Sequence, residues 1–402
     1  MITGTIRRVL LARGLRGFAD GYVSLLLPVY LIGLGYTPFQ VGAIATGTLL
    51  GSAALALLVG MHAHRLGYRT LLLAAAILMA ATGFAFAAVS DFWPLLVVAV
   101  IGTLNPSSGD VSVFLPLEQA VLAQVAADHE RTALFARYSL TGALAVALGA
   151  LFAGLPDLVV SRGYAGMKPA LQAMFVLYGL IGLGTRWVYR KLPVHLTTAE
   201  HAPATPLGPS RRIVLTLAAL FSLDAFGGGF VVQSMLALWL FERFELSTTA
   251  AGIIFFWAGI LSALSYVVAV RIAKRIGLVN TMVFTHLPAN LMLLLIPFVP
   301  QLGWVIVLLL ARSALSQMDV PTRGSYVMAV VSAPERPAAA SITAVPRSLA
   351  AAASPLLAGY LLGVSTFGWP LCIAGAVKIA YDVALLRMFR AVRPPEERKP
   401  TR

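Results

Sequence analysis

The chain has 402 residues, of which 59% are hydrophobic and only 11% are charged. Soluble domains carry roughly 25% charged residues, so this composition excludes an ordinary soluble fold. The net charge of +14 would suggest a nucleic-acid partner in a soluble protein. In a membrane protein it is expected to lie in the cytoplasmic loops instead, so no nucleic-acid partner is predicted.

Apolar runs broken by charged, glycine and proline residues predict an all-α integral membrane protein with twelve spans. Several runs of about 20 residues lack charge, which is long enough to cross a hydrocarbon core of about 30 Å. The first six spans are predicted at 10–34, 38–60, 69–90, 93–122, 133–155 and 167–189. The other six are predicted at 212–241, 247–271, 279–299, 303–331, 340–364 and 368–388.

The distribution of lysine and arginine predicts which side of the membrane each loop faces. If the N-terminus is cytoplasmic, the loops of the opposite side hold only Arg162, Lys168 and Arg243. This asymmetry predicts a multi-pass protein of the inner (plasma) membrane with both termini in the cytoplasm. The proline-rich stretch 192–210 predicts a cytoplasmic linker, which joins a bundle over 1–191 to a bundle over 211–402.

Short sequence elements recur in the two halves at nearly constant spacing, which indicates two duplicated six-helix bundles related along the membrane normal. Arg7-Arg8 followed by Asp20 recurs as Arg211-Arg212 followed by Asp224, and Arg65-Leu66-Gly67 recurs as Arg275-Ile276-Gly277. Pro116 recurs as Pro321, and Glu130-Arg131 recurs as Glu335-Arg336.

The predicted loop after the second helix resembles the hallmark of the major facilitator superfamily, G-x-x-x-D-R-x-G-R-R. Residues 60–69 fit this pattern except at His64 and Tyr68, and 270–279 contain a degenerate second copy. The resemblance covers nearly the whole chain and implies that superfamily's fold of two pseudo-symmetric six-helix bundles. It also implies a gating latch, in which basic side chains pair with carboxylates and helix C-termini of the other half. The residues of this latch are Gly60, His64, Arg65, Gly67, Arg69, Arg275 and Gly277. A simple topology signal is the alternative.

Three predicted spans contain residues that interrupt a helix. The fourth carries Asn105-Pro106-Ser107-Ser108-Gly109-Asp110 and the tenth carries 316–323, so both are predicted to be discontinuous and to line a central path. Gly227-Gly228-Gly229 in the seventh predicts a hinge or unwound turn, with close helix packing as the alternative. Glu118 and Arg323 follow the repeated prolines and are predicted to pair across the two halves.

Ionisable residues inside spans are costly and are therefore candidates for function. Helices 1, 4, 7 and 10 line the cavity in the family that the chain resembles, so their aspartates Asp20, Asp110, Asp224 and Asp319 are predicted to be proton-coupling candidates. Asp20 and Asp224 are favoured over Asp110 and Asp319. The arginines of helix 10 could pair with an anionic group of a substrate. The substrate-binding candidates are Arg312, Arg323, Glu118, Asn105, Gln233 and Gln317. The i, i+4 pairs Arg16–Asp20 and Lys378–Asp382 are predicted to neutralise each other.

These features predict secondary active transport of a small organic solute by alternating access, coupled to protons and directed outward. One alternative is a divalent or soft metal-ion transporter, indicated by Met282 and His286 on one helical face. Another is a non-transporting membrane receptor or assembly factor. Phosphate-binding loops and zinc-ligand spacings are missing from the sequence, so neither an enzyme nor a cofactor or bound metal is predicted. The predicted partners are the solute, protons and the lipid bilayer, with the chain as a monomer.

Overall fold

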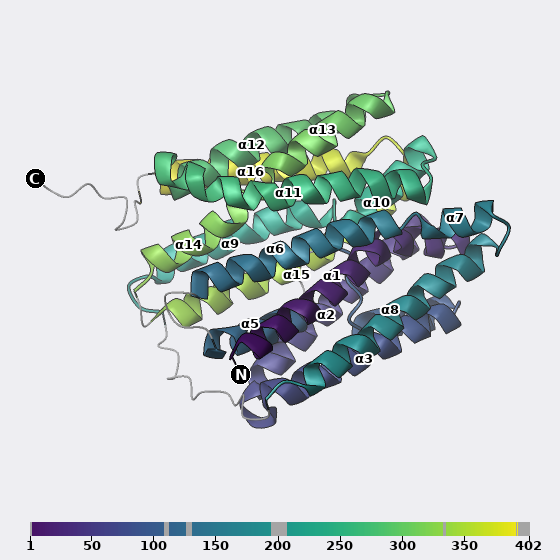
Figure 1. The fold of residues 1–402 in the computed structure, drawn as a ribbon. Helices are drawn as coiled ribbons and strands as arrows, with labels where there is room; N and C mark the ends of the chain where they lie inside the picture. Colours follow the sequence, from purple (N-terminus) through teal and green to yellow (C-terminus); the bar gives the residue numbers. More distant parts are fainter. Residues whose placement is uncertain are drawn as a thin grey trace, which may run out of the picture.

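Long α-helices cross the molecule from one end to the other (Figure 1). The computed structural model describes residues 2–107, 112–125, 131–193, 207–332, 335–390 and 392. Helix α1 (Ile2–Gly33) begins, and α16 (Trp369–Phe389) ends, at one end of the molecule, here termed the termini side. The short helix α7 (Leu155–Ser161) lies at the other end, here termed the α7 side.

The helices of the first half of the chain after α1 are α2 (Pro38–Leu66), α3 (Tyr68–Ala88), α4 (Phe92–Ile101), α5 (Phe114–Val125), α6 (Arg131–Phe152), α7 and α8 (Met167–Arg190). Those of the second half before α16 are α9 (Arg211–Gly229), α10 (Gln233–Phe244), α11 (Thr248–Ile276), α12 (Leu278–Leu295) with a 3-10 turn at Ile296–Phe298, α13 (Leu302–Leu315), α14 (Asp319–Val330) and α15 (Arg336–Val364). Most ends lie within a few residues of the predicted ones.

Ten helical segments among the described residues are long and apolar enough to cross a bilayer. Two shorter apolar helices, α4 and α13, each continue into a second helix, α5 and α14. Large apolar side chains such as Trp93 and Leu264 are exposed, as expected of surfaces that face lipid. The protein is therefore an all-helical, multi-span membrane protein, whereas the total of twelve spans stays a prediction.

The predicted helix breaks are confirmed. The fourth span is interrupted between Ile101 and Phe114, the tenth between Leu315 and Asp319, and the seventh between Gly229 and Gln233. Both interpretations of the seventh-helix glycines hold, because the helix ends there and also packs closely. A Cβ atom on Gly229 would lie 2.3 Å from the carbonyl oxygen of Ala351 on α15.

The two copies of the loop motif share one backbone conformation. Gly67 separates α2 from α3 with φ 71° and ψ 145°. Gly277 separates α11 from α12 with φ 87° and ψ 165°. Such positive φ values are accessible mainly to glycine, so the recurrence of this residue has a direct structural reason and supports the predicted duplication.

The two halves of the chain meet through small residues on the α7 side. Helix α2 packs against α15, and a Cβ atom on Gly42 would lie 2.4 Å from the carbonyl oxygen of Pro355. Helix α6 packs against α11, where a Cβ atom on Gly252 would lie 2.6 Å from the carbonyl oxygen of Ala150. Small residues let helix backbones approach this closely. We term these contacts of α2 with α15 and of α6 with α11 the glycine seam.

Candidate functional site

A cluster of charged side chains is buried among α9, α14 and α16. Asp224 on α9 accepts a hydrogen bond of 2.6 Å from Lys378 Nζ and one of 2.8 Å from Arg323 Nη2. Arg323 also donates to Asp319, one turn before it on α14. All four side chains are at least nine-tenths buried. We term these four residues the Asp224 cluster.

A second polar group lies beside this cluster, on α12 and α16. Asp382 Oδ1 is 2.9 Å from His286 Nδ1, and Asp382 Oδ2 accepts a hydrogen bond of 2.8 Å from Asn290 Nδ2. The other ring nitrogen, His286 Nε2, lies 3.8 Å from Asp224 Oδ1. The imidazole of His286 is thus placed between two buried carboxylates.

The first half buries its own ion pair between α1 and α5. Arg16 donates to Glu118, which also accepts hydrogen bonds of 2.6 Å from the hydroxyl groups of Tyr138 and Tyr189. Glu118 has no exposed surface, and these donors occupy both of its oxygens. Asp20 is also buried and lies within electrostatic range of Arg16.

Two predicted pairings differ from those in the structure. Glu118 and Arg323 do not pair with each other across the halves, because each binds a partner within its own half. Lys378 extends to Asp224 on α9 instead of Asp382 on its own helix. Arg16 forms an ion pair with Glu118 and also interacts electrostatically with Asp20, its predicted partner. A charged side chain can bind a residue one turn away on its own helix or a residue that helix packing brings close, and Lys378 binds the second kind of partner.

The broken helices of the two halves touch each other. The backbone N–H of Ser234, in the first turn of α10, donates a hydrogen bond of 3.0 Å to the carbonyl oxygen of Pro106, which follows α4. Asn105 is buried, and its Oδ1 accepts hydrogen bonds from the backbone N–H and hydroxyl of Ser107. The contact brings the segments of the candidates Asn105 and Gln233 together. Asp110 lies outside the described residues.

Arg312 differs from the other site candidates in its surroundings. It lies near the end of α13 and is half-buried. Among the described residues no hydrogen-bond acceptor reaches its Nε, and no carboxylate forms a salt bridge with it. The nearby candidate Gln317 accepts a hydrogen bond of 3.3 Å from the hydroxyl of Tyr266 on α11.

Arg69 of the gating motif binds within its own half. Arg69 Nη2 donates a hydrogen bond of 2.9 Å to the carbonyl oxygen of Arg190, the last residue of α8. A helix C-terminus is the expected type of partner, but α8 belongs to the same half as Arg69 instead of the other half. The side chains of 60–65 lie outside the described residues.

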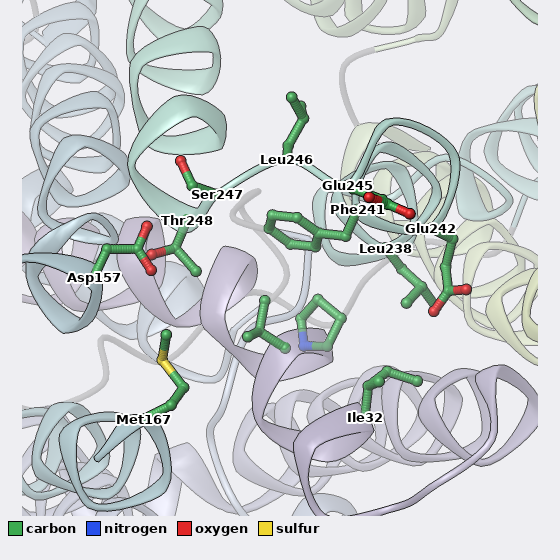
Figure 2. A pocket seen from close by; sticks show the side chains of 12 residues that line it. Ile32, Asp157, Met167, Leu238, Phe241, Glu242, Glu245, Leu246, Ser247 and Thr248 are labelled. Atoms are coloured by element: carbon green, nitrogen blue, oxygen red, sulfur yellow. The ribbon is translucent and has the colours of Figure 1, made fainter. Parts of the chain in front are cut away.

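An additional feature, which the sequence analysis did not identify, lies between the halves on the α7 side. A cavity of about 490 Å³ lies there. Figure 2 shows the side chains that line it, among them Ile32 and Phe241 together with the carboxylates of Asp157, Glu242 and Glu245. Asp157 Oδ2 accepts hydrogen bonds of 2.9 and 3.1 Å from the N–H and hydroxyl of Thr249 in the other half. No periodicity or motif could have predicted it, because Asp157 lies in a segment predicted as a loop.

The residues that suggested a soft-metal site have other roles in the structure. Met282 is fully buried in an apolar cluster with Val214 and Phe221. His286 faces Asp382 and Asp224. Within the described ranges there is no group of three or more His, Cys, Asp or Glu side chains arranged to hold a metal ion.

Helices that can span a bilayer, with charges buried inside the bundle, define a multi-pass α-helical membrane protein. The chain belongs to the Major Facilitator Superfamily, whose family model matches residues 9–317 and, in a second overlapping match, residues 217–402. Proteins of this superfamily are transporters and not enzymes, so the fold implies secondary transport.

Relatives of the chain are similar over different lengths. An uncharacterized membrane protein of Saccharomyces cerevisiae is 24% identical over 94% of this chain and 92% of its own length. The putative multidrug resistance protein MdtD of Yersinia enterocolitica is 34% identical over 21% of this chain and 19% of its own length.

Solved structures show the same fold at low sequence identity. The nucleoside transporter NupG has 14% identity over 96% of this chain and 99% of that chain, with a TM-score of 0.73. The human organic anion transporter MFSD10 has 18% identity over 96% of this chain and 99% of that chain, with a TM-score of 0.67.

Proposed function

We propose that this protein is a proton-coupled secondary transporter that exports a small organic solute carrying an anionic group. The observation that carries the proposal is the Asp224 cluster, where a buried carboxylate is shared by two cations next to a helix break. Buried charges are costly in a membrane and typically belong to substrate or proton pathways. In an alternating-access cycle, the two halves would rock around a site at the depth of the Asp224 cluster.

The coupling would operate by exchange of partners within the cluster. In the state described here, Lys378 and Arg323 balance the charge of Asp224. A proton on Asp224 would release one of these cations, and the released guanidinium of Arg323 could bind a substrate anion in two-point fashion. Loss of that proton would restore the ion pairs and expel the substrate. Asp20 is the equivalent candidate in the first half, beside an arginine that Glu118 already neutralises.

The guanidinium of Arg312, for which the described residues supply no carboxylate, favours an anionic substrate. A cation partly removed from water without a nearby counter-ion is unfavourable, so an anionic ligand would bind there with a gain in free energy. Structural relatives that carry nucleosides or organic anions agree with an organic substrate. The partial similarity to a putative multidrug resistance protein supports export.

The arrangement in the membrane is part of the same proposal. Twelve spans would consist of the ten long segments together with the pairs α4–α5 and α13–α14. The basic loops on the termini side would be cytoplasmic in the inner (plasma) membrane. The boundary of the two bundles at 192–210 and the monomeric state belong to this proposal as well.

The experiment begins with purified protein and a thermal-stabilisation screen of organic anions, nucleosides, hydrophobic drugs and divalent metals. The stabilising compound is then followed in proteoliposomes with an imposed pH gradient. We expect Asp224→Asn to abolish accumulation driven by the gradient but to retain exchange of substrate for substrate. Arg312→Gln should weaken binding about tenfold or more, since a charge-assisted contact contributes about 1.5–3 kcal/mol.

Matched variants keep this experiment decisive. Asp224→Asn leaves Lys378 without its carboxylate, so the double variant Asp224→Asn with Lys378→Met restores charge balance if the single one folds poorly. The exposed carboxylate of Asp91 supplies a control, and Asp91→Asn should transport like the wild type. Accumulation at the wild-type level in both Asp20→Asn and Asp224→Asn would refute coupling through these aspartates.

A further inference from the structure

Asp382 is a buried carboxylate to which neither cation of the neighbouring cluster is bound. It has no exposed surface. Within the part of the chain that the structure describes, its hydrogen-bonding partners are His286 at 2.9 Å and Asn290 at 2.8 Å. Lys378 lies one turn away on the same helix, yet its ammonium group binds Asp224.

This environment requires a proton. An ionised carboxylate without a cation is strongly unfavourable inside a membrane protein, and the amide of Asn290 supplies a hydrogen bond but no charge. Either His286 is an imidazolium ion or Asp382 is a carboxylic acid. In both cases the pair holds one proton more than an aspartate and a neutral histidine would.

The geometry also gives this proton a route. His286 Nδ1 faces Asp382, and Nε2 lies 3.8 Å from Asp224 Oδ1. An imidazole can accept a proton at one nitrogen and release one from the other. The other charged or titratable groups on the helices packed against α12 are Cys372, Lys378, Tyr381 and Arg387 of α16, Asp319, Arg323 and Tyr326 of α14, Arg312 of α13, and Tyr266, Arg271, Lys274 and Arg275 of α11. Arg347 of α15 lies within electrostatic range of Asp224.

We propose that Asp382 and His286 store one proton and pass it to Asp224, in exchange for Lys378. The Nε2–H bond of the imidazolium breaks and an O–H bond forms on Asp224, which leaves Asp382 ionised and His286 neutral. Lys378 then leaves the neutral Asp224 and pairs with Asp382, its i, i+4 neighbour on α16, so charge is balanced before and after. The inference rests on the proposed coupling at Asp224 and adds a proton site on α12 and α16.

The test needs no substrate and uses the full-length protein in detergent, with the proton as the only ligand. Thermal unfolding is measured between about pH 6 and pH 8, because free imidazole loses its proton near pH 6.5. In His286→Gln the carboxylate must hold the proton alone, so its melting temperature should fall by roughly 1–2 °C more than that of the wild type over this range, in which the unfolded histidine itself loses its proton. The double variant His286→Gln with Asp382→Asn removes both titrating groups and should lose that extra pH dependence.

A proton count supplies a second measurement that does not depend on the histidine variant. At pH 8, unfolding of the wild type in weakly buffered solution should release about one proton more than unfolding of Asp382→Asn, because free histidine is neutral there. Asp91→Asn should release as many protons as the wild type. Equal proton release from the wild type and Asp382→Asn, or equal pH dependence of His286→Gln and the double variant, would overturn the proposal.

These outcomes are independent of transport. If the liposome experiment detects no flux with any substrate but Asp382→Asn still releases one proton fewer, the proton store stands and the transport function fails. If flux follows the pH gradient but proton release is unchanged, the function stands and the proton is stored elsewhere.

Discussion

At the scale of single residues, the buried charges of this protein differ in how completely they are satisfied. Glu118 receives three donors, from Arg16, Tyr138 and Tyr189, and has no exposed surface. Removing one partner of such a buried pair typically costs about 3–5 kcal/mol of stability. Arg312 lacks such partners among the described residues. Glu118 is therefore satisfied in a way that suits a role in the stability of the first half, whereas the proposed function gives Arg312 to the binding of substrate.

Glu335, a carboxylate outside the predicted spans, allows a test of how a hydrogen-bonded charge contributes to the stability of the fold. Its carboxylate accepts a hydrogen bond of 2.6 Å from the hydroxyl of Ser332 and another from the backbone N–H of Gly208, at the end of the linker region. Hydrogen bonds from Ser332, Ser210 and Gly208, led by that of Ser332, lower the pKa of Glu335 from 4.5 to about 2. The folded pKa lies below the unfolded one, so this stabilisation is present above about pH 4.5 and is lost as the pH falls towards 2.

Glu335→Gln should therefore flatten the loss of stability between these two pH values. The measurement is thermal unfolding of the detergent-solubilised protein at steps of pH, with Asp91→Gln as the control for an exposed carboxylate. If the melting temperature of Glu335→Gln fell as steeply at low pH as that of the wild type, the contact of Glu335 with the linker end would not stabilise the folded state.

At the scale of helices, the sequence predicted where most of the long helices begin, end and break, because these features depend on local composition, whereas the short helix α7 lies in a segment predicted as a loop. Asn105-Pro106 and the three glycines after Phe226 interrupt their helices as their chemistry requires. Which side chains meet depends on the rotation and packing of helices, which local patterns do not encode. For that reason Lys378 was predicted to bind Asp382 but binds Asp224. The closeness of His286 to two carboxylates was missed for the same reason.

The glycine seam makes a prediction about one helix pair. A Cβ atom on Gly359 would lie 2.3 Å from the carbonyl oxygen of Pro38, whereas one on Gly363, a turn further along α15, would meet nothing within 4 Å. Gly359→Ala should therefore destabilise the closed α7 side by about 1–3 kcal/mol, the usual cost of overpacking. Gly363→Ala should leave it unchanged and is the matched control.

The measurement is the distance between spin labels on cysteines that replace Trp93 and Trp304, two exposed residues at the α7-side ends of α4 and α13. Gly359→Ala should populate longer distances than the parent and Gly363→Ala should not. The same distance distribution in all three proteins would mean that the seam does not hold this side closed.

At the scale of the whole molecule, the described contacts between the halves close the α7 side. The glycine seam joins α2 to α15 and α6 to α11, and α1 packs against α10. The cavity of Figure 2 lies between the halves on this side. Asp157 is the polar link, since its carboxylate caps backbone and hydroxyl donors of Thr249 across the interface. The buried Asp224 cluster would therefore exchange with the termini side in this state.

Asp157→Ala should loosen this closure. Capping hydrogen bonds at a helix N-terminus contribute about 1 kcal/mol, so the open population should rise roughly fivefold. The readout is the modification rate of a cysteine that replaces Leu246, which lines the cavity, in a Cys372→Ser background. A membrane-impermeant thiol reagent added to intact cells should react several-fold faster with the Asp157→Ala protein than with its parent.

Asp91 provides the matched control for this last experiment. It precedes α4 at the α7 side, and its side chain makes no capping hydrogen bond, so Asp91→Ala should not change the rate. The same labelling tests the orientation of the protein, because the α7 side must face outward if the termini are cytoplasmic. Equal rates in Asp157→Ala and its parent would contradict the role of Asp157 as a link. Modification in inside-out vesicles but not in intact cells would instead reverse the proposed topology.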